Sequence, residues 1–286
     1  MENTAKIVVD TVRVADRDRY LSALYAPREK RAALFSLYAF NAEIAGVRER
    51  IHEPLPGEVR LQWWRDVLAA ADPQAAASGH PLAEALIRTI AAHDLPRQAF
   101  DNYLEARIFD LYDDPMPSRT ELEGYCGETA SVLIQLAAMV LDRDTAPGFA
   151  ELAGRAGCAQ AITGLLLLLP LHRARGQCFV PAEILAAVGS SREEFLAGDG
   201  GAAAAHAIVA MIALSREHLG AFEAGASELP ASLRPAFLPL ALTGAYLDEL
   251  ESAGAALLRK TPRLSSLRRH WLLFRRATQG WPPVER

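Results

Sequence analysis

"YAFNAEIAGVRERI", residues 38–51, repeats apolar side chains at the spacing of one face of an α-helix. The repeat follows i, i+4, i+7 and i+11, at Phe40, Ile44, Val47 and Ile51. This period predicts a helix rather than a strand. The opposite face is apolar or small as well, so we expect this helix to lie at the centre of the fold with neighbours on both sides.

Two acids, Glu43 and Glu49, interrupt this central helix. A carboxylate in a buried helix either belongs to a functional site or neutralises a nearby cation. Arg48 and Arg50 are the local candidates for partners. Pairing with arginine is the more frequent outcome, so we expect ion pairs here before a site.

Helical spacing continues along the chain, and strand signals are nearly absent. A second apolar face is formed by Leu133, Leu136, Ala137 and Val140. Prolines fall where helices should end, and Ser118 followed by Glu121 is typical of a helix N-terminus. These signals predict an all-α helical bundle of more than eight helices.

The chain has 286 residues, of which 51% are hydrophobic, and this is enough for a large buried core. Neither a low-complexity linker nor a repeat of fixed period divides the sequence. We therefore predict a single domain over residues 1–286. It includes an N-terminal extension at residues 1–14 and a basic C-terminal segment at residues 260–286.

The charge of the chain is distributed unevenly. The net charge is −5, which argues against nucleic acid as a partner. From Arg259 to the end there are eight Lys or Arg and a single acid, Glu285. This last part carries +7, and the remainder of the chain carries −12.

The apolar residues of the basic segment also recur at helical spacing, at Leu264, Leu267, Trp271 and Phe274. Together with the surrounding arginines they predict a basic amphipathic helix. Two interpretations stay open. The helix packs back on the acidic remainder of the chain with its arginines paired, or it lies on an anionic membrane surface.

Three cysteines, Cys126, Cys158 and Cys178, form no CxxC pair, which argues against zinc and against a secreted disulfide framework. We expect buried thiols.

The N-terminus lacks the pattern of a signal peptide. The longest apolar run, residues 161–171, is shorter than the about 20 residues that span a bilayer. We expect a cytoplasmic bacterial protein, with this apolar run as a buried core helix.

Four stretches follow one another in a specific order: YLSALYAPREKRAALFSLYAFNAEI, LQWWRDVL, EARIFDLYDDP with TELEGYCGETAS, and GCAQAITGLLLLLPLHRARGQCFVP. In this order and spacing the sequence resembles the squalene/phytoene synthase family over residues 15–260. The resemblance implies an isoprenoid-synthase-type helical bundle around a central apolar cavity. It also implies, for active members, condensation of two prenyl diphosphates with Mg²⁺ held by two Asp-rich motifs.

Both Asp-rich motifs of that family are replaced in this chain. The first falls on Ala45, Gly46 and Glu49, and the second includes Leu168 and His172. Mg²⁺ requires hard oxygen ligands, which the family's carboxylate clusters supply beside the diphosphate. We therefore expect no catalytic residue, no metal site and no cofactor. We expect Mg²⁺ as a cofactor only under the alternative that the protein is an active enzyme.

The apolar cavity that the resemblance implies does not depend on the metal. Its expected ligand is an uncharged isoprenoid or another lipid with an acyl chain, and the alternative is collapse into ordinary core. The candidate lining residues are Tyr38, Ala42, Glu43, Ala45, Gly46, Glu49, Leu165, Leu168, His172 and Arg175.

The sequence also resembles a narrower branch of the family. Phe40, Asn41 and Glu43 form the Phe-Asn-x-Glu pattern of the branch that contains a mitochondrial complex I (NADH dehydrogenase) assembly factor and its bacterial relatives. This resemblance implies a non-catalytic role in respiratory complex I assembly. It implies complex I subunits or assembly proteins as partners, and peripheral contact with the inner face of the membrane. The alternative is a transferase that condenses two prenyl diphosphates carrying farnesyl or geranylgeranyl groups.

Overall fold

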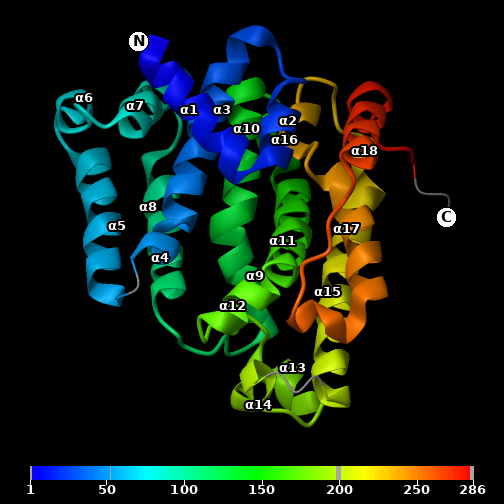
Figure 1. Cartoon of the computed structure of the whole chain (residues 1–286). Coiled ribbons are helices and arrows are strands. Elements are labelled where there is room, and N and C mark those ends of the chain that lie inside the picture. The colour runs from blue at the N-terminus through cyan, green and yellow to red at the C-terminus, as the bar shows by residue number, and fades with distance from the viewer. Residues whose placement is uncertain (1, 52, 198–200, 284–286) are drawn as a thin grey trace. The chain divides into compact units, whose positions relative to one another are not determined.

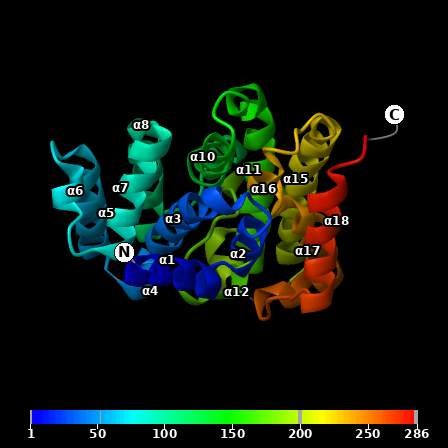
Figure 2. The same ribbon diagram turned by 90° about the horizontal axis from the view of Figure 1, so that it is seen from above.

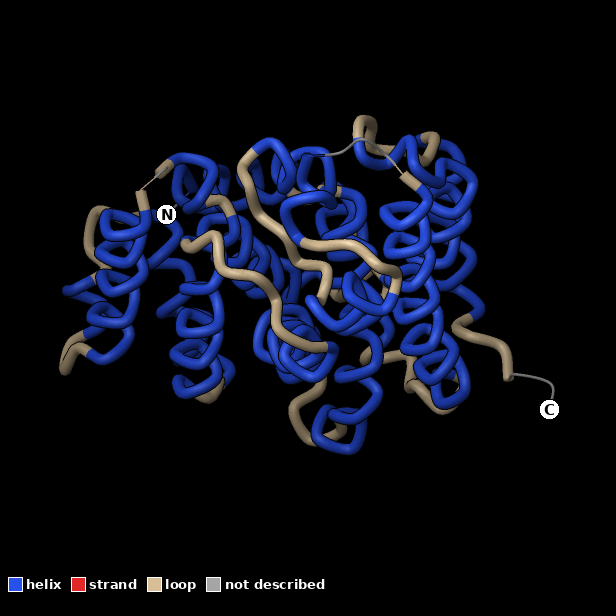
Figure 3. The backbone as a smooth tube through the Cα atoms, turned by 90° about the horizontal axis from the view of Figure 1, so that it is seen from below, coloured by secondary structure: helices blue, strands red, loops and turns tan. Residues whose placement is uncertain are grey.

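A computed structural model describes residues 2–51, 53–197 and 201–283. Within these ranges the chain forms helices and loops without a strand, as Figure 3 shows. The all-α prediction is confirmed, and the helices run to α18 within the described residues. The chain divides into two compact units. Unit 1 comprises Met1–Tyr112, Val132–Ala150 and Pro230–Ala236, and unit 2 comprises Asp113–Ser131, Glu151–Leu229 and Phe237–Arg286.

Unit 1 contains the following helices: α1 (Glu2–Ala15), α2 (Arg17–Ala23), α3 (Arg28–Ala45), α4 (Val47–Arg50), α5 (Pro54–Ala69), α6 (Pro73–Ala76), α7 (Pro81–His93), α8 (Arg97–Ala106), η1 (Arg107–Leu111), α10 (Val132–Leu141) and η3 (Ala146–Phe149), with most of α16 (Arg234–Phe237). Unit 2 contains α9 (Arg119–Cys126), the π-helical turn η2 (Gly127–Ser131), α11 (Ala150–Leu167), α12 (Leu169–Ala174), α13 (Ala182–Ala187), α14 (Arg192–Ala197), α15 (Ala202–Ala226), α17 (Leu240–Ala253), η4 (Gly254–Leu258) and α18 (Ser266–Gln279).

Helix α3 is the centre of unit 1. Helices α1, α7 and α10 pack against it, and Figure 2 shows α1 and α7 beside it. Leu34, Leu37 and Phe40 are completely or almost completely buried, which confirms the prediction of a central helix. Phe40 packs its ring against Trp64, Phe100 and Tyr103, with centroid distances of 5.2, 5.7 and 5.2 Å. Such aromatic contacts add to the free energy of burial.

Residues 1–14, which the sequence suggested as an N-terminal extension, lie mostly within α1. Val8 and Val12 of this helix are buried, since α1 packs on α3 and α7. The first helix is therefore part of the core of unit 1.

The central helix ends earlier than its apolar repeat suggested. Helix α3 stops at Ala45, and the short α4 begins after Gly46. Arg50 donates a hydrogen bond of 2.8 Å to the backbone carbonyl of Glu43, which is the acceptor that the next turn of an unbroken helix would use. Glycine adds to the break because it is a poor helix former.

The apolar run of residues 161–171 is also interrupted, so it is not one continuous core helix; the break lies beside Pro170, one of the prolines expected at helix ends. Helix α11 ends at Leu167, and α12 begins at Leu169. Pro170 lacks the N–H that would bond to the Leu166 carbonyl, and its ring collides with that carbonyl in an unbroken helix. Leu168, at the break, is 46% exposed.

The N-terminus of α9 agrees with the sequence. The Ser118 hydroxyl accepts a hydrogen bond of 3.2 Å from the Glu121 backbone N–H, as the N-cap pattern predicts. After α9 the chain continues through η2 into α10. The stretch Arg119–Leu141 has the length and apolar composition of a membrane span, but most of it is buried within the protein, as in a core helix. The α10 face predicted from Leu133, Leu136, Ala137 and Val140 is buried.

Unit 2 depends on a close approach between α11 and the π-helical turn. A Cβ atom at Gly157 would lie 2.4 Å from both the Cα and the backbone N of Ser131, distances that no packed side chain adopts. The Ser131 hydroxyl donates to the Gly154 carbonyl at 3.1 Å on the same helix. Only glycine fits at position 157.

We predict that Gly157→Ala destabilises the protein. The new methyl group cannot be accommodated without moving backbone, so we expect a loss of about 1–3 kcal/mol, typical of overpacking, or more. Thermal unfolding followed by circular dichroism measures it. Gly154→Ala is the matched control, because it lies on the same helix with no atom within 4 Å of its Cβ position. An equal Tm for the two variants would refute the close approach.

Candidate functional site

The end of α3 carries the position of the family's first Asp-rich motif. Ala45 and Glu49 are exposed, and Gly46 is half-buried. The nearby Glu43 carboxylate is mostly buried and accepts from two arginines, Arg50 at 2.9 Å and Arg60 at 2.8 Å. The expectation that Glu43 pairs with arginine is confirmed. Its negative charge is compensated within the protein and is not available to a metal.

Arg60 connects this carboxylate to an aromatic group. Its guanidinium lies 5.0 Å from the Trp63 ring centroid, and one of its nitrogens is 2.9 Å from His80 Nε2. His80 Nδ1 accepts a hydrogen bond of 3.2 Å from the Ala83 N–H and so caps the start of α7. Burial and the positive charge of Arg60 lower the pKa of His80. The cluster of Glu43, Arg60, Trp63 and His80 joins α3, α5 and the N-terminus of α7.

Tyr38 and Ala42 lie further back on α3. Tyr38 is buried, and its burial raises the pKa of its phenol to about 12. The Arg19 guanidinium lies 5.9 Å from the Tyr38 ring centroid. Tyr38 is therefore a neutral phenol that serves as a hydrogen-bonding or packing group, and not as a base. Ala42 is half-buried.

The second motif position lies in unit 2, at the junction of α11 and α12. Leu165 is half-buried and Leu168 exposed, whereas His172 is buried with its ring 4.7 Å from that of Phe179. Arg175, which follows α12, is half-buried. The segment is anchored by Arg173, which donates hydrogen bonds to the backbone carbonyls of unit 2 neighbours.

The side chains at these positions do not fit Mg²⁺. The ion prefers near-octahedral oxygen ligands with carboxylates among them. One position offers Ala45, Gly46 and Glu49, and the other offers Leu168 and His172. No group of three or more His, Cys, Asp or Glu side chains suited to a metal occurs among the described residues. The three cysteines are buried, as expected, and form no disulfide.

The predicted ligand-cavity residues thus fall into two sets. Tyr38, Ala42, Glu43, Ala45, Gly46 and Glu49 follow one another along α3 and α4 of unit 1, and Leu165, Leu168, His172 and Arg175 surround the α11–α12 junction of unit 2. A cavity lined by both sets stays a prediction. Unit 1 has a different cavity of about 380 Å³ between α1, α3 and α7, and none of these residues lines it.

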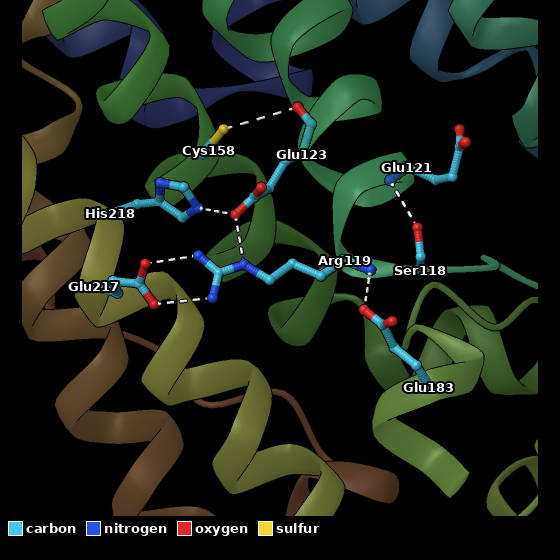
Figure 4. Close-up of polar contacts among 8 residues, drawn as sticks. All are labelled: Ser118, Arg119, Glu121, Glu123, Cys158, Glu183, Glu217 and His218. Atoms are coloured by element: carbon cyan, nitrogen blue, oxygen red, sulfur yellow. Dashed lines mark hydrogen bonds and ion pairs between the residues drawn. The ribbon is translucent and has the colours of Figure 1, made fainter. Parts of the chain in front are cut away.

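Sequence reasoning missed a polar network of unit 2, shown in Figure 4. Glu123 Oε1 accepts from Arg119 Nε at 2.8 Å and lies 2.9 Å from Nε2 of the buried His218. Arg119 also forms two hydrogen bonds with Glu217, at 2.6 and 3.1 Å, and these lower the pKa of the Glu217 carboxyl. The spacing of Arg119 and Glu123 is a visible i, i+4 pair, but their partners on α15 lie about one hundred residues away.

The network joins α9 to α15, and its side chains are engaged with one another. The Arg119 backbone N–H donates to Glu183 of α13 at 2.6 Å, so a third helix joins the network. A charged group with several hydrogen-bond partners is held in one position, and here the Arg119 guanidinium lies between the carboxylates of Glu123 and Glu217. We interpret this network as structural.

The chain belongs to the squalene/phytoene synthase family, whose sequence profile matches residues 12–270. Its fold is similar to two solved synthase structures. A squalene synthase HpnC from Alicyclobacillus acidocaldarius has a TM-score of 0.71 at 19% identity, covering 88% of this chain and 94% of that one. A dehydrosqualene synthase has a TM-score of 0.79 at 15% identity, covering 96% and 95%. At these identities the likeness establishes the isoprenoid-synthase fold alone.

Several relatives with higher sequence identity than these two structures are named as assembly factors and not as synthases. A Bos taurus protein named "NADH dehydrogenase (ubiquinone) complex I, assembly factor 6" is 27% identical over 87% of this chain and 74% of its own length. The rat protein of the same name is 29% identical over 85% and 72%. A Drosophila melanogaster homolog is 29% identical over 90% and 78%. The chain is similar to these assembly factors over most of both lengths.

We predict that His80 makes stability depend on pH. Its folded-state pKa is lowered, so the unfolded chain takes up this proton first as the pH falls. The contribution of neutral His80 to the free energy of unfolding is complete above the ordinary histidine pKa of about 6.5. It is lost as the pH falls from about 6.5 toward the lower pKa of the folded state. His80→Asn keeps a capping side chain without titrating. Between about pH 7.5 and pH 5.5 the Tm of the wild type should therefore fall further than that of His80→Asn.

His206→Asn, an exposed histidine on α15, is the control for this measurement. Its Tm should follow the wild type across the same pH range. A wild-type curve parallel to that of His80→Asn would contradict the assignment of the pH dependence to His80.

Proposed function

We propose that this protein is a non-catalytic member of the squalene/phytoene synthase family that acts in the assembly of respiratory complex I. The observation that carries the proposal is the replacement of both metal-binding motifs, with Ala45, Gly46, Leu168 and His172 where aspartates belong. The assignment to complex I assembly is supported by the names of its relatives, which are complex I assembly factors. Subunits or assembly proteins of complex I are the proposed partners.

The physical reason against catalysis is charge. A diphosphate that leaves beside an apolar wall needs cations to neutralise it, because an unpaired ion in low dielectric costs several kcal/mol. Of the first motif's acids only Glu49 is present. Glu43 of α3, which lies beside the motif position, is bound by Arg50 and Arg60. The second motif position offers one imidazole, His172, whose ring packs on Phe179. No cofactor is part of the proposal.

The alternative, transfer of farnesyl or geranylgeranyl groups, is supported by the family and by the fold that the chain shares with squalene and dehydrosqualene synthases. Such a transferase would need Mg²⁺. The same side chains that argue against a metal argue against this alternative.

We predict that the protein does not turn over prenyl diphosphates. Incubation with farnesyl or geranylgeranyl diphosphate and Mg²⁺ should give no squalene, no phytoene and no released diphosphate above a blank without protein. A known squalene synthase, assayed in parallel, verifies the assay. Product above the blank would establish the transferase alternative.

The ligand and the location are further parts of the proposal. We propose that an uncharged isoprenoid or another lipid occupies a cavity lined by the ten predicted residues. Mass spectrometry of solvent extracts from the purified protein checks this, and an extract without lipid counts against it.

We propose a cytoplasmic protein that contacts the inner face of the membrane peripherally, because the complex that it is proposed to assemble is membrane-bound.

We predict that loss of this protein lowers the amount of assembled complex I in its own cells. Native gel electrophoresis of solubilised membranes measures the assembled complex, with another respiratory complex as the control. The wild-type gene should restore assembly. Glu49→Gln should restore it equally, because the proposal assigns this last motif acid no metal. Failure of Glu49→Gln alone would point back to a metal site, and unchanged complex I in the deletion strain would refute the assembly role.

A further inference from the structure

Helix α18 turns its apolar stripe outward. Leu267, Trp271 and Phe274 are 83%, 60% and 51% exposed, although the sequence gives them the spacing of a buried face. Only Leu273 is buried among the residues of α18. Large apolar side chains gathered on one exposed face mark an interaction surface rather than ordinary protein surface.

The geometry of the helix makes the stripe continuous. At 100° per residue, Leu267, Trp271 and Phe274 fall within about 60° of one another around the axis, and Leu273 lies on the far side. The rings of Trp271 and Phe274 are 6.3 Å apart. Figure 1 shows α18 beside α17, the helix that it packs against.

Two arginines hold α18 in this orientation. Arg268 pairs with Glu249 of α17 at 2.7 Å, and Arg269 donates to the Tyr246 hydroxyl at 2.9 Å. The alternative in which arginines pack back on the chain is thus met for Arg268 and Arg269, although the aromatic stripe stays exposed. Contact with a membrane stays a prediction. The pairing fixes which face of the helix is presented.

Other cations stay free. Arg259, Lys260, Arg263 and Arg275 are exposed and form no ion pair among the described residues. Residues 252–283 contain no Asp or Glu. Around the helix axis Arg275 lies next to Trp271, so positive charge borders the apolar stripe.

We propose that α18 docks on the surface of an anionic lipid bilayer, with Leu267, Trp271 and Phe274 in the interfacial layer. The four free cations then contact lipid headgroups. An anionic bilayer supplies both layers that this face requires, negative charge outside and an apolar layer beneath, and tryptophan favours their boundary. This proposal rests on the proposed function in one respect: it states where at the membrane the assembly factor would act.

Sedimentation with vesicles tests the proposal on the full chain. The protein should bind vesicles of phosphatidylglycerol and phosphatidylcholine and bind pure phosphatidylcholine at least about tenfold more weakly. Part of the binding should survive about 0.5 M salt, because the aromatic insertion is not screened. The triple variant Leu267→Ser, Trp271→Ser, Phe274→Ser should bind at least about tenfold more weakly than the wild type.

A matched triple variant controls for the loss of apolar surface in general. Leu55, Val59 and Val209 are 70%, 64% and 58% exposed and lie on other helices, so their change to serine should leave binding intact. Equal Tm values establish that both variants fold. Binding by the α18 variant equal to the wild type, or no wild-type binding to anionic vesicles, would overturn the proposal.

The complex I measurement separates this inference from the proposed function. If the wild type does not bind vesicles but restores complex I, membrane docking is overturned and the assembly role stands. If the wild type binds vesicles but the deletion leaves complex I unchanged, the assembly role fails and docking stands. If the α18 variant loses assembly although the wild type does not bind vesicles, the stripe contacts a protein, and this too overturns docking.

Discussion

The burial of helix α3 on almost all sides is the constraint on which unit 1 depends. Helices α1, α7 and α10 pack against it, and its Phe40 ring packs among three aromatic rings from α5 and α8. The buried Asn41 side chain of α3 has a partner in this core, because the Tyr103 hydroxyl donates to its Oδ1 at 2.9 Å. An unsatisfied amide there would cost about 1–3 kcal/mol. Unit 2 has its counterpart in the approach of Gly157 to Ser131.

Charge compensation within the protein connects this scaffold to function. The resemblance to the family implies that its enzymes need carboxylates to hold metal ions. Here Glu43 of α3, beside the first motif position, is bound by two arginines. In unit 2 the Glu123 and Glu217 carboxylates are likewise bound by Arg119. Acids and bases thus join helices in both units, and the fold of the family is kept. Fold alone does not define function, and these side chains argue for binding over chemistry.

Helix α18 presents the opposite situation, since its charges and its apolar side chains are separated. The paired arginines attach it to α17, and the aromatic side chains face outward. A helix attached through its polar contacts can present apolar area to another surface at little cost in stability. This is how the most basic part of the chain becomes a candidate contact for a membrane.

Much of the architecture follows from the sequence alone, because helix formation and burial depend on local period. The spacing of Phe40, Ile44 and Val47 predicted a buried face, and Ser118 predicted a helix start. The order of the four motifs indicated the family, and the missing aspartates were visible without coordinates. These are properties of residue type and separation along the chain.

Tertiary structure decided the features that depend on distant partners. The Glu123–His218 contact joins residues that no local pattern relates. Trp271 faces outward because Leu273 takes the buried side of α18 while Arg268 and Arg269 bind α17. A helical period determines which residues share a face, but only the packed neighbours determine whether that face is buried.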